Sequence, residues 1–224
     1  MPTITDPVAH FSGLANTSLR EAAITDGTVA VTDAHRDAVD SVQDSLTVGH
    51  ALDQKLAGLD ANRIHLTKAS YEEKRRTAIN DATELSGQAA RRYTRAAEAA
   101  ETALLDSSLP KLPSDGRELL ARQELEVALG KAQGPDVGSR VLGLANSGSP
   151  EVQAALGTPY ARTALIARQV PNVDRILRDA KRVVATAGTT PEAQKASDGL
   201  AKMGVLGGAQ AAALAAVRHS LPRS

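Results

Sequence analysis

The chain reads TDAHRDAVDSVQDSLTVGHALDQKLAGLDANRIHLTKASYEEKRRTAINDATELSGQAARRYTRAAEAAETALLD from Thr32 to Asp106, and this stretch decides the fold. It contains no proline and is rich in Ala, Glu, Arg, Lys and Leu, which favour helix. Its apolar residues return every three or four positions, as on one stripe of an amphipathic helix. At ~1.5 Å per residue an unbroken helix would be about 110 Å long. Such a helix could not cover its own stripe within 224 residues. We therefore expect either a long helix that pairs with another chain or a helical hairpin.

The apolar stripe predicts a coiled-coil-like seam for self-association, because its spacing alternates between three and four residues. The larger seam residues are Val42, Leu46, Leu52, Leu56, Leu59, Leu85 and Tyr93. The weakest helical segment is Gly58–Asn62, since Gly and Asn both disfavour helix. A bend there would give a compact hairpin, and no bend would give an extended stalk. The sequence leaves both open, with a slight preference for use of the helix between subunits.

Residues 1–31 are interpreted as an extended N-terminal arm. Pro2 and Pro7 favour extended backbone for the residues that precede them. Ser18 and Glu21 fit a capping box, which predicts a short helix from Leu19 to Ile24. The β-branched segment 27–32 could form one strand, although an extended lead-in to the long helix is the favoured interpretation.

Prolines at Pro110 and Pro113 end the long helix, and the pattern then changes to short helices. Capping residues stand directly before Pro150, Pro159 and Pro191, where a proline suits the first helical position. Further helices are expected over 114–131, 134–146 and 171–187, and Gly207-Gly208 is expected to separate the last two helices. The sequence thus predicts an all-α fold with three parts: the arm over 1–31, the long helix or hairpin over 32–108, and a compact multi-helix domain over 114–222.

Composition argues against several classes of function. The chain has no Cys, so neither disulfides nor thiolate chemistry is available. No Gly-rich phosphate loop or catalytic signature is present. We therefore expect no enzyme activity, no catalytic residue, no cofactor and no metal. The N-terminus lacks the pattern of a signal peptide, and no window approaches the ~20 apolar residues of a spanning helix, so no membrane partner is expected.

Three histidines, His35, His50 and His65, are spaced by 15 residues. On a helix that step corresponds to ~22 Å, so no two of them could share a metal ion. Three unrelated surface histidines are the favoured interpretation, over a pH-sensitive stack in a parallel oligomer.

Charge is distributed unevenly along the neutral chain. Residues 1–60 carry three basic and nine acidic side chains, whereas residues 160–224 carry ten basic and four acidic ones. Chance and head-to-tail association of copies are both open explanations. The best candidate binding face consists of Arg168, Arg175, Arg178, Lys181 and Arg182. It could contact an acidic protein or phosphates, or be an ordinary solvated helix face. No aromatic residue accompanies it for base stacking.

The layout resembles small structural and assembly proteins of tailed-phage particles, especially from actinobacterial hosts. The features that carry the resemblance are the arm Met1–Val31, the Ala/Arg/Glu-rich helix Asp33–Asp106 and a small α domain nearly free of aromatics. The composition of Arg91–Ala97 fits a high-GC genome. This is similarity of layout over the whole chain, so no functional residue is carried over from the family.

These features predict a non-enzymatic structural or assembly protein that acts by self-association or by docking in a larger complex, such as the capsid or connector of a phage virion. The partners would be other copies or other structural proteins. The alternatives are a nucleic-acid-associated protein that uses the basic face and a cytosolic coiled-coil regulator. The expected location is the virion for a phage protein and the cytoplasm otherwise.

Overall fold

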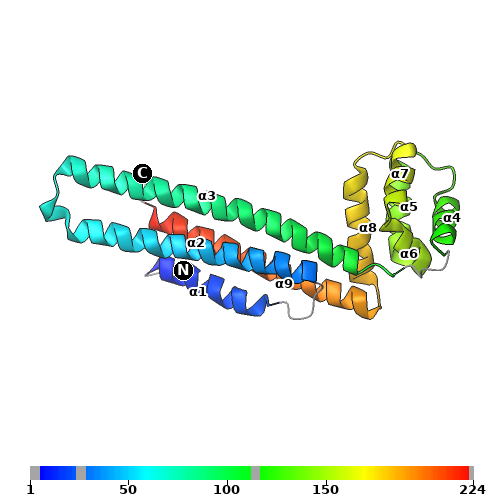
Figure 1. Cartoon of the computed structure of the whole chain (residues 1–224), viewed down its shortest axis with the longest axis horizontal. Helices are drawn as coiled ribbons and strands as arrows, with labels where there is room; N and C mark the ends of the chain where they lie inside the picture. The colour runs from blue at the N-terminus through cyan, green and yellow to red at the C-terminus, as the bar shows by residue number, and fades with distance from the viewer. Residues whose placement is uncertain (1–5, 24–28, 112–116, 222–224) are drawn as a thin grey trace, which may run out of the picture. The chain divides into compact units, whose positions relative to one another are not determined.

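The computed structural model describes residues 6–23, 29–111 and 117–221, and within these ranges all regular structure is helical. This confirms the predicted all-α class. The elements are α1 (Pro7–Glu21), α2 (Val29–Ala61), the 3₁₀ turn η1 (Arg63–His65), α3 (Lys68–Ser107), α4 (Arg117–Leu129), α5 (Pro135–Ser147), α6 (Pro150–Leu156), α7 (Pro159–Ala167), α8 (Val173–Ala187) and α9 (Pro191–Ser220) (Figure 1).

The chain divides into two compact units, and the division differs from the predicted domains. Unit 1 contains α1, α2, α3 as far as Ala100, and α9 from Ala201 onward. Unit 2 contains the segment Glu101–Leu200, which includes α4 to α8. Unit 2 is therefore inserted between the third and fourth helices of unit 1. The second part of α9 belongs with the long helices, and not with the compact domain expected over 114–222.

The long apolar stretch forms a helical hairpin, which settles the choice that the sequence left open. Helix α2 continues through Gly58 and ends at Ala61, so the break begins at Asn62, the last residue of the expected joint. The side-chain amide of Asn62 donates a hydrogen bond to the Gly58 carbonyl over 2.8 Å at this end. Thr67 then starts α3 by accepting a hydrogen bond from the Ser70 amide at 3.2 Å.

Two ion pairs follow the antiparallel register of the hairpin. Arg92 of α3 lies 3.0 Å from Asp44 of α2, and Lys55 of α2 lies 3.6 Å from Asp81 of α3. Pairs so exposed contribute little stability, typically below about 1 kcal/mol. The register is instead determined by the buried residues between the helices, among them Leu52, Ala78 and Ala82.

The expected extended arm is wrong for the described residues, because α1 begins at Pro7. The Asp6 carboxylate accepts a hydrogen bond from the Ala9 amide at 3.0 Å, so Asp6 is an N-cap and Pro7 occupies the first turn. Pro7 therefore starts a helix where we expected extended chain. The candidate strand over 27–32 lies partly outside the described residues, and from Val29 the chain is helical.

Helix α9 completes unit 1 as a four-helix bundle in which α1 and α3 run antiparallel to α2 and α9 (Figure 1). Its Gln210 donates a hydrogen bond to Ser45 of α2, and its Val217 lies against Gly49 of α2. The expected separation at Gly207-Gly208 is wrong, since both glycines lie within a continuous helix.

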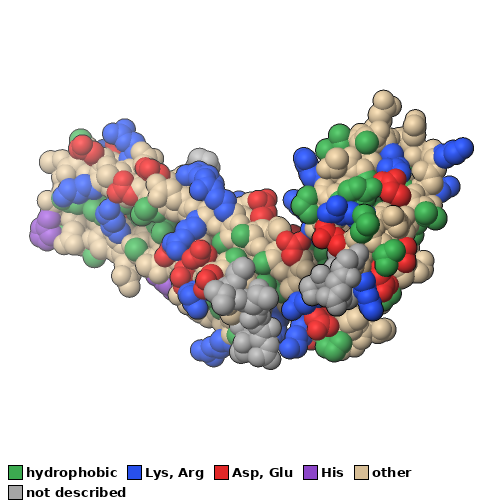
Figure 2. Space-filling model, turned by 45° about the vertical axis from the view of Figure 1, so that its right-hand side comes forward, with side chains coloured by type: hydrophobic (Ala, Val, Ile, Leu, Met, Phe, Trp, Pro, Cys, Tyr) green, Lys and Arg blue, Asp and Glu red, His purple; other side chains and the backbone are tan. Residues whose placement is uncertain are grey.

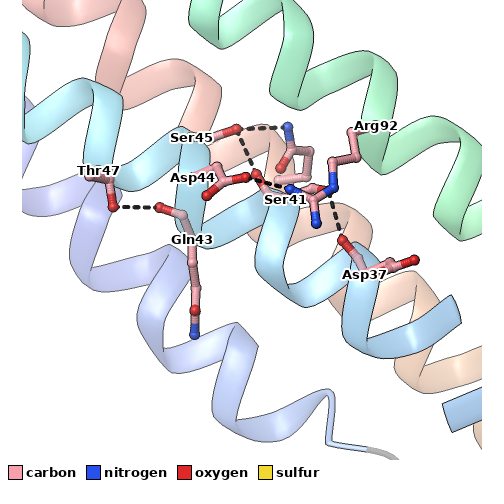
Figure 3. A network of polar contacts seen from close by, with 8 residues as sticks. Asp37, Ser41, Gln43, Asp44, Ser45, Thr47 and Arg92 are labelled. Carbon is pink, nitrogen blue, oxygen red and sulfur yellow. Dashed lines mark hydrogen bonds and ion pairs between the residues drawn. The ribbon is translucent and has the colours of Figure 1, made fainter. Parts of the chain in front are cut away.

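Figure 3 shows the polar side chains of α2 around Ser41 and Ser45, and Arg92 of α3 beside Asp44.

Small side chains dominate the interior of unit 1. The buried residues of α3 within this unit are Ala78, Ala82, Ala89, Ala96 and Ala100. Those of α2 include Ala38, Ser41, Val42, Ser45, Leu46, Gly49 and Leu52. Small residues bring helix axes close together, at the cost of less apolar area per residue than Leu or Phe would bury. The core of unit 1 is therefore thin, and side chains of this chain form it.

Unit 2 has a conventional apolar core built from α4 to α8. Its larger fully buried members are Leu125, Leu129, Val137, Val141, Leu156 and Leu165. The predicted helix starts at Pro135, Pro150, Pro159 and Pro191 are confirmed. At Pro150 the Ser149 hydroxyl caps α6 by accepting a hydrogen bond from the Val152 amide at 3.3 Å.

Helix α9 is long and apolar enough to cross a membrane by length and composition alone, with an 18-residue window of mean hydropathy 1.4. The sequence expectation missed this because it required a run of ~20 apolar residues, whereas mean hydropathy tolerates the polar residues of α9. Within unit 1 this helix buries one face, which includes Leu206, Ala209, Ala213 and Val217. The core helix of a bundle meets the same criterion.

Candidate functional site

The predicted basic residues lie on α8 because its other side is anchored in the core of unit 2. Val173, Leu177, Ala180 and Val184 are buried at helical spacing. The intervening cations must therefore lie at the edges of the helix or outside it. Arg168 precedes α8, and the connection contains two non-glycine residues with positive φ, Gln169 at 56° and Asn172 at 54°.

Arg168 is occupied by an internal carboxylate. It pairs with Glu126 of α4 through both guanidinium NH2 groups, one at 3.3 Å, and also donates to the Ala164 carbonyl at 3.1 Å. The Tyr160 hydroxyl donates to the same carboxylate over 2.7 Å. The hydrogen bond from Arg168 and then that from Tyr160 lower the pKa of Glu126. This cluster ties α4 to the end of α7 and is a structural clamp.

Two further cations of the predicted face are paired with the last turns of α3. Lys181 lies 2.6 Å from Asp106, and Arg182 pairs with Glu101. Arg175 lies 3.8 Å from Asp179, one turn away on the same helix. The predicted residues therefore do not form a continuous unpaired basic face. On the face that Figure 2 shows, Lys and Arg side chains are interspersed with Asp and Glu.

Arg178 differs from its neighbours because it has no ion pair or hydrogen bond among the described residues. It lines a pocket of about 400 Å³ in unit 2. The apolar lining of this pocket comes from Leu105, Leu156, Leu177 and Pro159. The charged lining consists of Asp106, Arg162, Asp174, Arg178 and Lys181, and the remaining residues are Thr102, Gly157 and Thr158. We call this site the α8 pocket.

Two of the charged groups of the α8 pocket, Arg162 and Asp174, form a bidentate pair. Arg162 of α7 donates to the two carboxylate oxygens of Asp174 at 2.8 and 3.4 Å. This hydrogen-bonded pair lowers the pKa of Asp174 and raises the pKa of Arg162, and the charge of Arg178 lowers the pKa of Asp174 further. Together with Lys181 and Asp106, the pocket holds three cations and two carboxylates, so one positive charge is unmatched.

Sequence reasoning identified only part of this site. Asp174, Arg178 and Lys181 follow one another at i, i+4 and i+7, so helical periodicity alone places them on one side of α8. The sequence alone could therefore have grouped these three residues. The contributions of Arg162 and Asp106 come from other helices, and no local pattern marks them.

The predicted self-association seam is used largely inside the chain. Val42, Leu46 and Leu52 are buried within unit 1, and Leu56, Leu59 and Tyr93 are partly buried. Leu85 is the exception, at 51% exposed. It lines a smaller pocket of about 290 Å³ with Asp44 and Arg92.

The histidines do not form a set. His35 is buried, contrary to the surface position that we expected, and its Nε2 donates to the Ala22 carbonyl at 2.9 Å. His50 and His65 are exposed. His219 of α9 stacks on Phe11 of α1 with ring centroids 5.1 Å apart. Within the described part of the chain, no group of three or more His, Cys, Asp or Glu side chains could hold a metal ion.

Comparison with known proteins gives no relative from which to transfer a role. No family model matches the chain, and neither a curated protein nor a solved structure is significantly similar to it. The functional argument therefore depends on the chain's own geometry.

Proposed function

We propose that this protein is a non-enzymatic helical component of a larger assembly, that it docks onto a partner protein through unit 2, and that the assembly is a tailed-phage particle. The observation that carries the docking proposal is the α8 pocket, with apolar walls and an unmatched cation at its rim. The phage assignment is supported only by the composition and by the long helices that accompany a small α domain, since the extended arm of the resemblance is replaced by α1.

Docking is favoured over self-association through the seam. The seam side chains Val42, Leu46 and Leu52 are buried within the chain, so they are not free to contact another copy. The same closure weakens the regulator alternative, since that function needs a dimeric stalk. The best remaining candidate for a binding surface is therefore in unit 2.

The nucleic-acid alternative receives less support than the number of basic residues on and beside α8 suggests. Arg168, Lys181 and Arg182 are each paired with a carboxylate of the same chain, so they would have to break these pairs to bind phosphates. Salt-dependent DNA retardation tests this alternative. Retardation that falls steeply with salt and is lost on charge reversal of Arg175 and Arg178 would favour it.

Two measurements test the proposed function. Light scattering on the purified chain should give a monomer, and a stable dimer would favour self-association instead. For the phage assignment, particles of the phage that encodes this sequence should contain the protein. Cross-linking mass spectrometry on those particles should join Lys111, Lys131 or Lys195 of unit 2 to another virion protein. Absence from particles would refute the assignment, and links from unit 1 alone would refute docking through unit 2.

A further inference from the structure

We propose that the α8 pocket binds a short peptide segment in which an acidic residue lies next to a leucine-sized apolar residue. The inference rests on the proposed docking function and names the feature of the partner that unit 2 recognises. It is carried by the juxtaposition of an unpaired Arg178 with leucine side chains in a pocket of about 400 Å³.

The size of the pocket limits the ligand. Small-molecule sites occupy about 300–1,000 Å³, so the α8 pocket lies at the low end of that range. One or two residues of an extended segment fit such a volume. Leu177, at 8% exposed, offers most of the leucine surface in the pocket, whereas Leu105 and Leu156 are 2% and 1% exposed and lie behind it. An apolar side chain that covers this surface would remove it from water.

The charge of the pocket requires one negative group. Arg162 and Asp174 neutralise each other, as do Lys181 and Asp106. The Arg178 guanidinium acts on Asp174 through its charge but has no ion pair or hydrogen bond among the described residues. A guanidinium binds a carboxylate through two parallel hydrogen bonds. A single Asp or Glu side chain therefore matches the pocket in both charge and geometry.

The rim offers acceptors as well as donors, and this favours a peptide over a nucleic acid. Asp106 and Asp174 present carboxylate oxygens with spare lone pairs that can accept from peptide N–H groups. These carboxylates repel any anion, but a peptide brings N–H donors that can satisfy them, whereas a phosphate backbone supplies acceptors only. The pocket lining contains no aromatic ring on which a base could stack.

The test is a ¹H–¹⁵N chemical-shift titration of the full chain with end-capped dipeptides. N-acetyl-Leu-Asp-amide should give saturable shifts at Gly157, Thr158 and Arg178, with a dissociation constant on the order of 1 mM. N-acetyl-Leu-Asn-amide, which lacks the charge, and N-acetyl-Gly-Asp-amide, which lacks the apolar side chain, should each bind at least tenfold more weakly.

Charge reversal supplies the matched control. Arg178→Glu should weaken binding of the Leu-Asp probe at least tenfold, and it should allow N-acetyl-Leu-Lys-amide to bind. Arg175→Glu makes the same charge change one turn earlier on α8, outside the pocket, and should leave binding unchanged. Both side chains are exposed, so both variants should fold.

Several results would overturn the inference. They are the absence of saturable shifts with the Leu-Asp probe, equal binding of the Leu-Asn probe, and equal sensitivity to Arg175→Glu and Arg178→Glu. Inorganic phosphate that causes the same shifts with equal affinity would show a simple anion site, and single-stranded DNA that does so would show a nucleic-acid site. The proposed function is tested separately. If cross-links from unit 2 to a neighbour persist with Arg178→Glu, docking stands and the pocket inference fails.

Discussion

Gln210 of α9 donates a hydrogen bond to the hydroxyl of Ser45 of α2 over 3.2 Å inside unit 1. The Ser45 hydroxyl in turn donates a hydrogen bond to the Ser41 carbonyl over 3.0 Å. The other side-chain atom of Gln210, Oε1, is buried without a hydrogen-bond partner among the described residues. A buried polar atom left unpaired costs about 1–3 kcal/mol, while a neutral hydrogen bond contributes about 1 kcal/mol. The pair thus helps define which faces of α2 and α9 meet, with little net gain in stability.

Replacement of Gln210 by methionine should therefore leave the free energy of unfolding unchanged or raise it by about 1 kcal/mol, because a side chain of similar shape removes the unpaired Oε1. Urea denaturation monitored by circular dichroism measures the difference. Gln210→Ala is the control and should destabilise the bundle, because it leaves a cavity. A clear loss of stability in Gln210→Met would mean that Oε1 is satisfied in the folded protein.

Gly49 should tolerate alanine but no large side chain. A Cβ at this position would lie 3.4 Å from the Val217 Cγ2 atom and 3.6 Å from the Val217 backbone nitrogen. Gly49→Ala should be neutral or stabilising by up to about 1 kcal/mol through helix propensity. Gly49→Leu should destabilise by about 1–3 kcal/mol, because the α9 backbone cannot move aside easily.

Gly58 is the matched position for this comparison, since a Cβ there would have no heavy atom within 4 Å. Gly58→Ala and Gly58→Leu should both stabilise α2 by about 0.5–1 kcal/mol. Thermal melts of the four variants should show a lowered melting temperature for Gly49→Leu alone. A Gly49→Leu protein as stable as Gly58→Leu would contradict the close approach of α2 and α9.

Removal of the Arg168 side chain should weaken unit 2 by about 1–2 kcal/mol, since it leaves the Glu126 carboxylate with one hydrogen bond from Tyr160. The pKa of Glu126 is lowered in the folded protein, so its contribution is present above the ordinary value of 4.5 and is lost as the pH falls through the folded-state pKa. Arg168→Ala should therefore reduce the loss of stability below pH 4.5. Arg162→Ala disrupts a more exposed pair and should cost less stability than Arg168→Ala does.

His35 should make unit 1 sensitive to mild acid. Burial lowers the pKa of His35, opposed by its hydrogen bond to the Ala22 carbonyl and aided by the charge of Lys202. The unfolded chain therefore binds a proton near pH 6.5 that the folded chain binds only at lower pH. The stabilisation is complete above pH 6.5 and is lost as the pH falls from 6.5 to the folded-state pKa.

Urea denaturation at pH 7.5 and pH 5.5 tests this contribution. Over the one unit below 6.5, His35 can account for at most about 1.4 kcal/mol of lost stability. His35→Gln keeps a donor for the Ala22 carbonyl but does not titrate, so it should lose less stability on acidification. His50→Gln, at an exposed position, should behave as the unmodified chain does. Equal losses in all three proteins would exclude a role for His35.

Local sequence signals predicted much of the fold. Periodicity gave the apolar face of the hairpin, and Gly58 and Asn62 marked a break within a few residues of its position. The helix starts at Pro150, Pro159 and Pro191 followed from a capping residue before proline. Helix α1 was missed although Asp6-Pro7 carries the same signal, because the arm was interpreted from its prolines alone.

What could not be predicted depends on contacts between residues far apart in the chain. Lys181 pairs with Asp106 across 75 residues, and Arg168 pairs with Glu126 across 42. No pattern on α8 shows that its cations are matched in this way. The placement of α9 beside α2 likewise depends on complementary surfaces, such as Gly49 against Val217, that only the folded chain brings together.

The insertion of unit 2 between α3 and α9 has a consequence for biosynthesis. The ribosome releases α1, α2 and α3 before the rest of the chain. The apolar faces of α2 and α3 cannot be fully covered until α9 emerges, about one hundred residues later. In that interval the hairpin exposes its small-residue face, while unit 2 has local connections and can fold ahead of it. Early folding of unit 2 shortens the effective loop that joins α3 to α9, which lowers the entropic cost of closing the bundle. Slow translation through unit 2 should therefore extend the period in which the nascent chain is open to chaperones or to misassembly.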